Sequence, residues 1–365
     1  MIPVPTAKST PSSSLCLGLA ETSSDMVPHR TSFVHNINSF VRVLELMNDG
    51  TRYIAGLSYG GIISEPIIPK HDAYKKGDMT HLTLHDGQNC LAVSADNKMW
   101  AVATNGVARL YRFGWEKPES EQFPLKNSTE MMQGKQMRGS AAMAFSPDCK
   151  QLVVTAQRRL TVYDVESRKE QGGLSLPFDV YTIAFSPCGT RLAVAGDSKD
   201  IAIVDWGSWE KIHFIEEAHR YWCNALKWSQ DGSLLVTVGI NDTNVFRTQD
   251  WTRLRDPIPT GRTTVVDVFS GVDKESALVL VANEDGKVMV IDAATGDIVF
   301  SQQDPDKMTP CAVRFLPNCS DIIYAGNIPR VRCLRWLPLQ QILAECKATT
   351  VLPHDVLDRL TSFSA

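Results

Sequence analysis

Two histidines four residues apart, His81 and His85, are the residues of this sequence most suggestive of a metal site. His71, Asp72 and Asp86 lie nearby in the sequence, and imidazole and carboxylate groups are common metal ligands. The alternation in HLTLHD, however, is typical of a β-strand, in which residues four apart are separated by about 13 Å at ~3.3 Å per residue. That span is too long for one ion, so we predict no metal site and interpret the segment as a solvated strand.

Two common motifs of enzymes do not occur in the sequence. It contains neither the phosphate-binding pattern G-x-x-x-x-G-K-[ST] nor the zinc-protease pattern H-E-x-x-H. Gly60 and Gly61 lie between two apolar segments and predict a tight hairpin, because glycine accepts positive φ. We therefore expect a protein that is not an enzyme, with no cofactor and no small-molecule substrate.

The segment Arg220-Tyr221-Trp222 has the composition of a protein-binding site. These three residue types are enriched in interaction hot spots, because they combine a large contact area with polar groups. His219 immediately precedes them. Whether these side chains can act together depends on the fold that presents them.

The composition is that of a globular protein with little net charge. The chain has 365 residues, 43% of them apolar, and its 37 Lys and Arg against 41 Asp and Glu give a net charge of −4. Such a chain lacks the positive surface that binds phosphate backbones, so we do not expect nucleic acid as a partner. No apolar run approaches the ~20 residues of a membrane helix, so we predict no membrane segment.

The nine cysteines point to a reducing compartment. Their number is odd, no two have C-x-x-C spacing, and most lie in apolar segments, as Cys90 does in NCLAV and Cys333 in VRCLRW. Small buried thiols, rather than disulfides or zinc ligands, are the simplest interpretation. We therefore expect the protein in the cytoplasm or the nucleus, between which the sequence does not distinguish.

A repeat organises most of the chain. Similar segments contain Phe145, Phe185, Trp228 and Phe315, at spacings of 40, 43 and 87 residues, and the longest spacing leaves room for one more unit. Extending the period in both directions gives seven units, anchored at Leu46, Val93, Phe145, Phe185, Trp228, Phe269 and Phe315. A repeat of 40–45 residues is typical of a propeller blade.

Each unit is predicted to form four short strands. In the fourth unit the alternating or apolar segments are Tyr181–Phe185, Arg191–Ala195, Ile201–Val204 and Lys211–Ile215. A single four-stranded sheet has two apolar faces that it cannot bury alone, whereas a ring of sheets buries both. The sequence therefore predicts an all-β fold, a seven-bladed β-propeller of four-stranded antiparallel blades.

The predicted propeller spans residues 31–348. Residues 1–30 are rich in Ser, Thr and Pro and predict a disordered tail, whereas 349–365 predict a C-terminal tail in which Pro353 and Asp355 can start a short helix. Two segments could supply the outer strand of the last blade. One is Gln341–Glu345, and the other is Ser32–Asn36, which would clasp the two ends of the ring together.

Several segments resemble the WD-repeat family. Ala218-His219, the turn Ser229-Gln-Asp-Gly232 and the hydrophobic close Val245-Phe246 match one repeat, and similar turns occur at Ser146–Asp148 and Ser186–Gly189. Tyr163-Asp164 and Ile291-Asp292 stand in place of the family's terminal Trp-Asp pair. The resemblance implies a rigid platform for protein partners and gives His219 a structural role within a blade. Because only His219 matches the repeat histidine, packing must stabilise most blades.

The leading hypothesis is a non-catalytic scaffold or adaptor that docks proteins or peptides, within a multi-subunit complex. In a propeller, the loops between blades share one face with the loops between the two middle strands. That face is predicted to carry Arg220, Tyr221 and Trp222 together with Tyr59, Arg158, Arg159 and Arg330. Its mixture of cations and aromatics would suit an acidic peptide. Alternatively, Trp222 covers a neighbouring blade and the arginines are merely solvated.

Two other function classes remain open. Residues 291–300 (IDAATGDIVF) are similar to a motif of quinoprotein propellers, so a propeller enzyme, either hydrolytic or quinoprotein-like, with a site at the ring centre is one alternative. Such an enzyme needs convergent carboxylates, histidines or a metal at the centre. The second alternative is an RNA-associated subunit that uses a rim of cations and aromatics.

Overall fold

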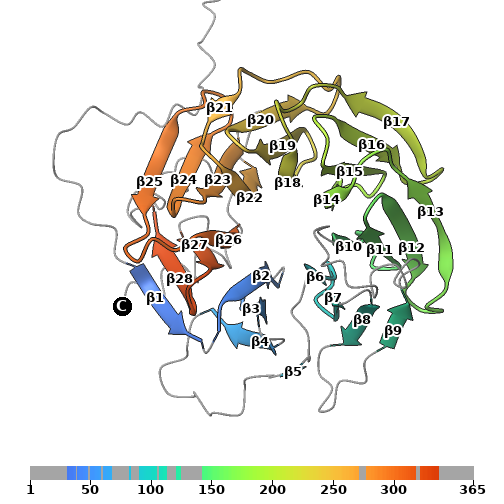
Figure 1. Ribbon diagram of the computed structural model, residues 1–365, viewed down its shortest axis with the longest axis horizontal. Helices are drawn as coiled ribbons and strands as arrows, with labels where there is room; N and C mark the ends of the chain where they lie inside the picture. The colour runs from blue at the N-terminus through green and yellow to red at the C-terminus, as the bar shows by residue number, and fades with distance from the viewer. Residues whose placement is uncertain are drawn as a thin grey trace, which may run out of the picture.

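The computed structural model is a closed ring of seven four-stranded antiparallel sheets, viewed along the ring axis in Figure 1. It describes residues 31–37, 39–47, 50–58, 61–67, 82–83, 90–104, 107–112, 121–124, 142–270, 277–317 and 321–336. These residues contain strands and turns but no helix, and hence no helix able to cross a membrane. The predicted all-β, seven-bladed propeller is confirmed.

Each blade is built from strands that follow one another from the ring axis outward, except in blade 7. The first three blades are β2 (Val41–Leu46), β3 (Arg52–Leu57), β4 (Gly61–Pro66), β5 (Leu82–Thr83); β6 (Cys90–Val93), β7 (Met99–Thr104), β8 (Val107–Arg112), β9 (Glu121–Pro124); and β10 (Met143–Phe145), β11 (Gln151–Ala156), β12 (Arg159–Asp164), β13 (Glu170–Ser175). Blades 4 and 5 are β14 (Val180–Phe185), β15 (Arg191–Gly196), β16 (Ile201–Asp205), β17 (Glu210–Ile215) and β18 (Cys223–Trp228), β19 (Leu234–Gly239), β20 (Asp242–Arg247), β21 (Ile258–Pro259). Blades 6 and 7 are β22 (Thr263–Ser270), β23 (Ala277–Asn283), β24 (Lys287–Asp292), β25 (Ile298–Gln303) and β26 (Pro310–Phe315), β27 (Asp321–Gly326), β28 (Arg330–Arg335), β1 (Thr31–Asn36).

The sequence repeat coincides with the blade. All seven predicted anchors lie on innermost strands, from Leu46 on β2 to Phe315 on β26. The four strands predicted for the fourth unit are β14 to β17, with each boundary within one residue of the prediction. The repeat was therefore visible because each blade needs an apolar residue at the same place beside the ring axis.

Alternating residues of a strand face the two neighbouring blades. On β15, Leu192 and Val194 pack against blade 3, whereas Ala193 and Ala195 pack against blade 5. The buried apolar residues of the described chain form seven clusters of this kind, one at each interface between adjacent blades. Each blade is thus a layer between two others, and burying one side chain of this size contributes about 1.5–3 kcal/mol.

A serine stabilises the turn that joins the first two strands in four blades. The hydroxyl of Ser146 donates to Asp148 Oδ1 at 2.6 Å and accepts the Gln151 N–H at 2.9 Å, and Ser94 and Ser229 make the same pair of bonds. In blade 4, Cys188 replaces the aspartate after Ser186. These are the Ser-Pro-Asp-Gly-like turns of the sequence resemblance, and they set the register of the innermost strands.

The N-terminal strand closes the ring. Strand β1 is the outer strand of blade 7 and pairs antiparallel with β28 from Asn36 opposite Arg330 to Thr31 opposite Leu334. The clasp predicted for Ser32–Asn36 is therefore confirmed, and it joins the start of the propeller to its end (Figure 1). The other candidate, Gln341–Glu345, lies outside the described residues, as do the tails 1–30 and 349–365.

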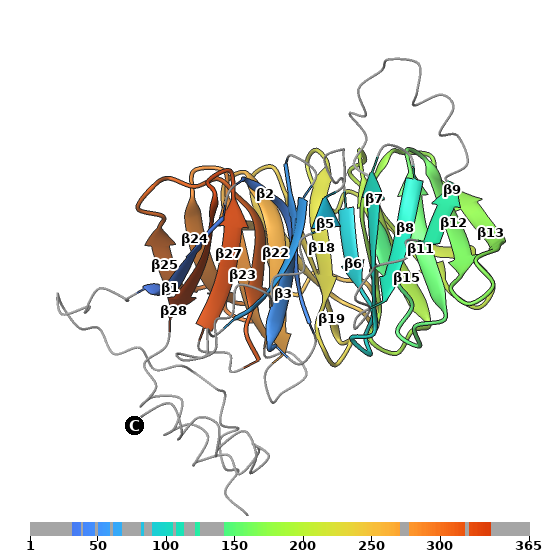
Figure 2. The ribbon, with the colours of Figure 1, turned by 90° about the horizontal axis from the view of Figure 1, so that it is seen from below.

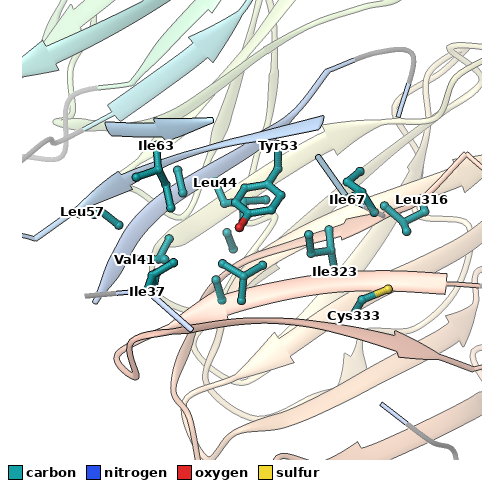
Figure 3. Packing of buried hydrophobic residues seen from close by; sticks show 14 residues of the cluster. Ile37, Val41, Leu44, Tyr53, Leu57, Ile63, Ile67, Leu316, Ile323 and Cys333 are labelled. Atoms are coloured by element: carbon teal, nitrogen blue, oxygen red, sulfur yellow. The ribbon is translucent and has the colours of Figure 1, made fainter. Parts of the chain in front are cut away.

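The seam between blades 7 and 1 is also closed by packing (Figure 3). Leu44 and Tyr53 of blade 1 lie in one buried cluster with Ile323 and Cys333 of blade 7. The Tyr53 hydroxyl donates to Glu65 at 3.1 Å, so the ring of this buried tyrosine is held at its polar end. The seam is as well packed as the other interfaces, and the strand β1 adds main-chain pairing to it.

We expect removal of residues 31–36 to lower stability sharply. A chain that starts at Ile37 loses the pairing along β28 at a cost of about 1 kcal/mol for each hydrogen bond. The reference is a chain that starts at Thr31 and keeps the strand. Urea unfolding of the two chains measures the difference, and equal free energies of unfolding would show that β1 does not clasp the ring.

Candidate functional site

The connections between blades lie on the same face of the ring as the turns between the two middle strands. This follows from the antiparallel order of the strands, and Figure 2 shows that loops gather at the two opposite faces of the ring. We call the face that holds these loops the connection face. Arg158 lies in the middle turn of blade 3, and Arg159 and Arg330 begin the third strands of blades 3 and 7 at this face. Tyr59 lies outside the described residues.

His219 fixes the connection between blades 4 and 5 from within. The ring is 2% exposed, its Nδ1 lies 2.7 Å from Asp242 Oδ1 and its Nε2 lies 2.9 Å from the Thr237 hydroxyl. Asn244 Nδ2 also lies 3.2 Å from Nδ1. Phe246, near the end of β20, has no polar side-chain group that could add a hydrogen bond to this network. The imidazole therefore joins the connection to the second and third strands of blade 5, a structural arrangement.

Arg253 holds the same connection from the outside. Its guanidinium donates to the carbonyl oxygens of Glu217 at 2.6 Å and Ala218 at 3.2 Å, and it lies over the ring of Phe246 at 5.6 Å. The residues that follow, 220–222, are thus presented on a segment that is anchored on both sides. Such anchoring reduces the conformational entropy that binding would cost.

Tyr221 is the exposed centre of this segment. It is 45% exposed, the guanidinium of Arg220 lies 5.5 Å from its ring centre, and the rings of Tyr221 and Trp222 are 6.4 Å apart. Trp222 is half-buried and donates its indole N–H to Asn224 at 3.1 Å, while Asn224 donates to the carbonyl of Thr263 in blade 6. Trp222 is therefore linked to the next blade through Asn224, and Arg220 and Tyr221 offer the accessible surface.

The other predicted arginines of the connection face are paired with carboxylates. Arg158 lies 3.2 Å from Asp179, Arg159 lies 3.2 Å from Glu170, and Arg330 binds Asp306. Arg158 and Asp179 join the middle turn of blade 3 to the connection that leads into blade 4. The other two pairs join the third and fourth strands of blade 3, and the third strand of blade 7 to the connection before that blade. Each of these arginines therefore has a carboxylate beside it, although the side chain of Arg158 stays 67% exposed.

Carboxylates are prominent on the connection face near blade 4. Burial raises the pKa of Tyr181 above its ordinary value, and the negative charges of Asp197 and Asp179 raise it further. Glu216 and Glu217 extend this acidic area towards Arg220 and are both exposed. An acidic peptide is thus disfavoured near blade 4, where the field opposes a second negative charge.

The innermost strands of four successive blades carry alternating charges. Lys227 of blade 5 lies 3.9 Å from Asp267 of blade 6, Asp267 accepts the N–H of Phe315 of blade 7 at 2.8 Å, and Arg314 of that blade binds Glu45 of blade 1 at 2.5 Å. Burial alone would lower the pKa of Arg314, but the charges of Glu45 and Asp267 raise it. The equivalent positions of blades 2, 3 and 4 are Ala92, Ala144 and Ala184.

We call these alternating charges on the innermost strands of blades 5, 6, 7 and 1 the charged arc, and they are relevant to the hypothesis of a propeller enzyme with a site at the ring centre. Its carboxylates are used in ion pairs and in a main-chain hydrogen bond between blades, so they do not converge on a common point. Among the residues that the structure describes, no group of three or more His, Cys, Asp or Glu is placed to hold a metal ion. His81 and His85 lie outside those residues.

One serine motif escaped the sequence analysis. Residues 56–60 read GLSYG, the G-x-S-x-G spacing of a nucleophile elbow, which requires a strand followed by a helix. Here Gly56 and Leu57 end strand β3, and the Ser58 hydroxyl donates to the carbonyl of Phe40 at 3.2 Å. The hydroxyl thus secures the connection between blades 7 and 1, and scanning for the motif would have found it.

Cys188 differs from the thiols expected in the core. It is exposed, and hydrogen bonds from Ser186, Thr190 and the Thr190 main chain lower its pKa to about 7. Burial instead raises the pKa of Cys90 and Cys223 to about 12. The description of all cysteines as buried hydrophobes was wrong for Cys188, because its turn position normally holds an aspartate whose partners also stabilise a thiolate.

Comparison with known proteins agrees with the geometry of blade 5. Residues 209–246 match the family described as "WD domain, G-beta repeat". The chain therefore contains one recognisable WD repeat within a seven-bladed propeller. The matched segment runs from the turn before β17 to Phe246 and contains His219, Thr237 and Asp242, so the polar network of blade 5 lies within this repeat. No curated protein matches the chain.

We expect the stabilising effect of Asp242 to disappear in acid. Burial opposes its charge, but bonds from His219 and Asn244 lower its pKa below the ordinary value near 3.9. The unfolded chain therefore takes up the proton first, and stability present above about pH 4 is lost as the pH falls through the lower folded-state value. Urea unfolding should show Asp242→Asn less stable at pH 7, with the gap shrinking at pH 3. A gap independent of pH would contradict this account.

We expect Cys188 to be alkylated before the buried thiols. With a pKa of about 7 the thiolate is abundant at neutral pH, whereas Cys90 and Cys223 remain protonated and inaccessible. Brief iodoacetamide treatment of the folded protein followed by peptide mapping should label Cys188 with a rate that rises through pH 7. Replacing Ser186 by Ala should move this midpoint upward. Equal labelling of Cys90 would refute the assignment.

Proposed function

We propose that this WD-repeat propeller is a non-catalytic scaffold or adaptor that docks protein partners on its connection face. The observation that supports the proposal most directly is the anchored segment with exposed Tyr221 at its centre and Arg220 over the ring. WD-repeat propellers generally serve protein interactions, and Arg and Tyr at an accessible, preorganised place are suited to an interaction hot spot.

The proposed mechanism is that the rigid propeller holds residues 220–222 in a fixed position for a partner. His219 and Arg253 hold the connection from its two sides, so the loop pays little ordering entropy when a partner binds. Trp222 lies beside Tyr221 and donates to Asn224, which in turn donates to Thr263 of blade 6. Membership in a multi-subunit complex and a cytoplasmic or nuclear location are parts of this proposal.

The same geometry argues against a propeller enzyme and against an RNA-associated subunit. The charged arc beside the axis is consumed by ion pairs, which leaves little for the acid–base or metal chemistry of an enzyme. The paired arginines and the carboxylates near blade 4 are a poor surface for RNA, whose phosphates need accessible cations.

Affinity purification with mass spectrometry tests the proposed face. Tagged wild type is compared with the Arg220→Ala/Trp222→Ala double variant and with Ile298→Ala, which removes an exposed apolar side chain from the outer strand of blade 6. We expect the double variant to lose partners that the control retains.

Because Trp222 is half-buried, thermal unfolding of the double variant is measured in parallel, and Tyr221→Ala replaces it if the fold is weakened. The same set of partners recovered with all variants would eliminate this face as the docking site.

A further inference from the structure

The outer strand of blade 4 ends at an open notch. The notch has a volume of about 660 Å³ and lies among Pro177, Ser198, Lys199, Asp200, Phe214, Glu216 and Glu217. Phe214 is the penultimate residue of β17, and Pro177 comes from the connection that leads into blade 4. One wall is thus apolar, and the notch opens on the connection face beside Arg220.

The acidic side of the notch is held in place. The N–H of Glu217 donates to Asp200 Oδ1 at 2.9 Å, and the Glu217 carbonyl accepts Arg253. Within the described part of the chain the carboxylates of Glu216 and Glu217 have no ion-pair partner, in contrast to Asp179, Glu284 and Asp306 on the same face. The lining of the notch carries three carboxylates and one cation, Lys199, and Arg253 lies behind it on the Glu217 carbonyl, so the lining itself is negative.

Strand β17 leads into this notch along an open edge. The sheet order ends with β17, and among the described residues no strand pairs with its outer side. Glu210, Lys211 and Ile212 are exposed along it, Ile212 by 49%. His213 of this strand stacks on Trp251 of blade 5 with ring centres 5.7 Å apart, as Trp209 of blade 4 lies against Gly172 of the outer strand β13 in blade 3. Among the described residues these side-chain contacts leave the main-chain edge of β17 unpaired.

An extended segment of a partner fits both features together. Unpaired main-chain groups at a sheet edge accept an added strand, and alternate side chains of that strand give specificity. A lysine or arginine has an aliphatic stem for Phe214 and Pro177 and a cationic end for Glu216 and Glu217. A negatively charged residue would meet the same carboxylates and be repelled.

We propose that the edge of β17 and the notch at its end bind an extended segment of a protein partner, with a lysine or arginine side chain in the notch. This rests on the proposed docking function and specifies the chemistry of the partner. The adjoining Arg220 and Tyr221 would contact the same partner farther along the connection face.

Selection from a phage-displayed library of random linear peptides tests this on the full chain. We expect enriched sequences to share a lysine or arginine flanked by alternating apolar residues. A labelled synthetic peptide of the enriched sequence should bind Glu216→Gln/Glu217→Gln about fivefold more weakly than wild type. The matched control, Glu284→Gln/Asp285→Asn, removes the same charge from the middle turn of blade 6 and should bind normally.

Two further measurements separate the edge from simple charge attraction. Methylating the peptide amides one at a time should weaken binding at alternate positions, since only every second amide of an added strand faces β17. Ser198→Tyr, which fills the notch without changing its charge, should also weaken binding. Enriched peptides without a basic residue, no enrichment, equal loss in the control, or indifference to amide methylation would each overturn the proposal.

The outcomes also distinguish this inference from the proposed function. If Arg220→Ala/Trp222→Ala loses its cellular partners while the notch variants bind every selected peptide normally, the connection face stands and the β17 groove is wrong. If the notch variants lose the peptide while the double variant keeps all its partners, the groove stands and the role assigned to residues 220–222 is wrong.

Discussion

Every sheet in this protein must be covered on both faces, and the rest of the structure follows from that constraint. Adjacent residues of β15 enter different interfaces, so neither face can be left to water without exposing a row of apolar side chains. A ring satisfies all blades at once, whereas an open stack would leave two faces uncovered. Closing the ring requires that distant parts of the chain meet. Thr31 pairs opposite Leu334, and a buried apolar cluster forms between blades 7 and 1.

The blades meet this constraint by different means. Blade 5 has the buried network of His219, Thr237 and Asp242, and it is the blade within the matched repeat. Blade 7 instead buries Asp304 against Tyr324 and Arg332, and blades 2 and 3 rely on apolar packing with a serine-stabilised turn. Because packing tolerates many apolar residues while a polar network tolerates few, the family signature survives in one blade although the ring needs all seven.

Charge is distributed by the fold in a way that net charge does not reveal. The chain is close to neutral, yet ion pairs link blades 5, 6, 7 and 1 beside the axis, and unpaired carboxylates gather at the edge of blade 4. Carboxylates lie beside Arg158 and Arg330 on the connection face and offset their charge. The unpaired carboxylates at the edge of blade 4, together with the aromatic residues beside them, would determine which kind of partner this face accepts.

The amino-acid sequence determined the repeat, the four strands of each unit and the face on which Arg220 to Trp222 lie, and it offered residues 32–36 as one of two candidates for the closing strand. These features depend on patterns within about 45 residues or on strand alternation, and such patterns are readable locally. Only the tertiary structure decided which arginines have a carboxylate partner, that Cys188 is exposed, that Asn224 links Trp222 to blade 6 and that β17 ends in an acidic notch. Each of these depends on which side chains of neighbouring blades meet, and sequence spacing carries no record of such distances.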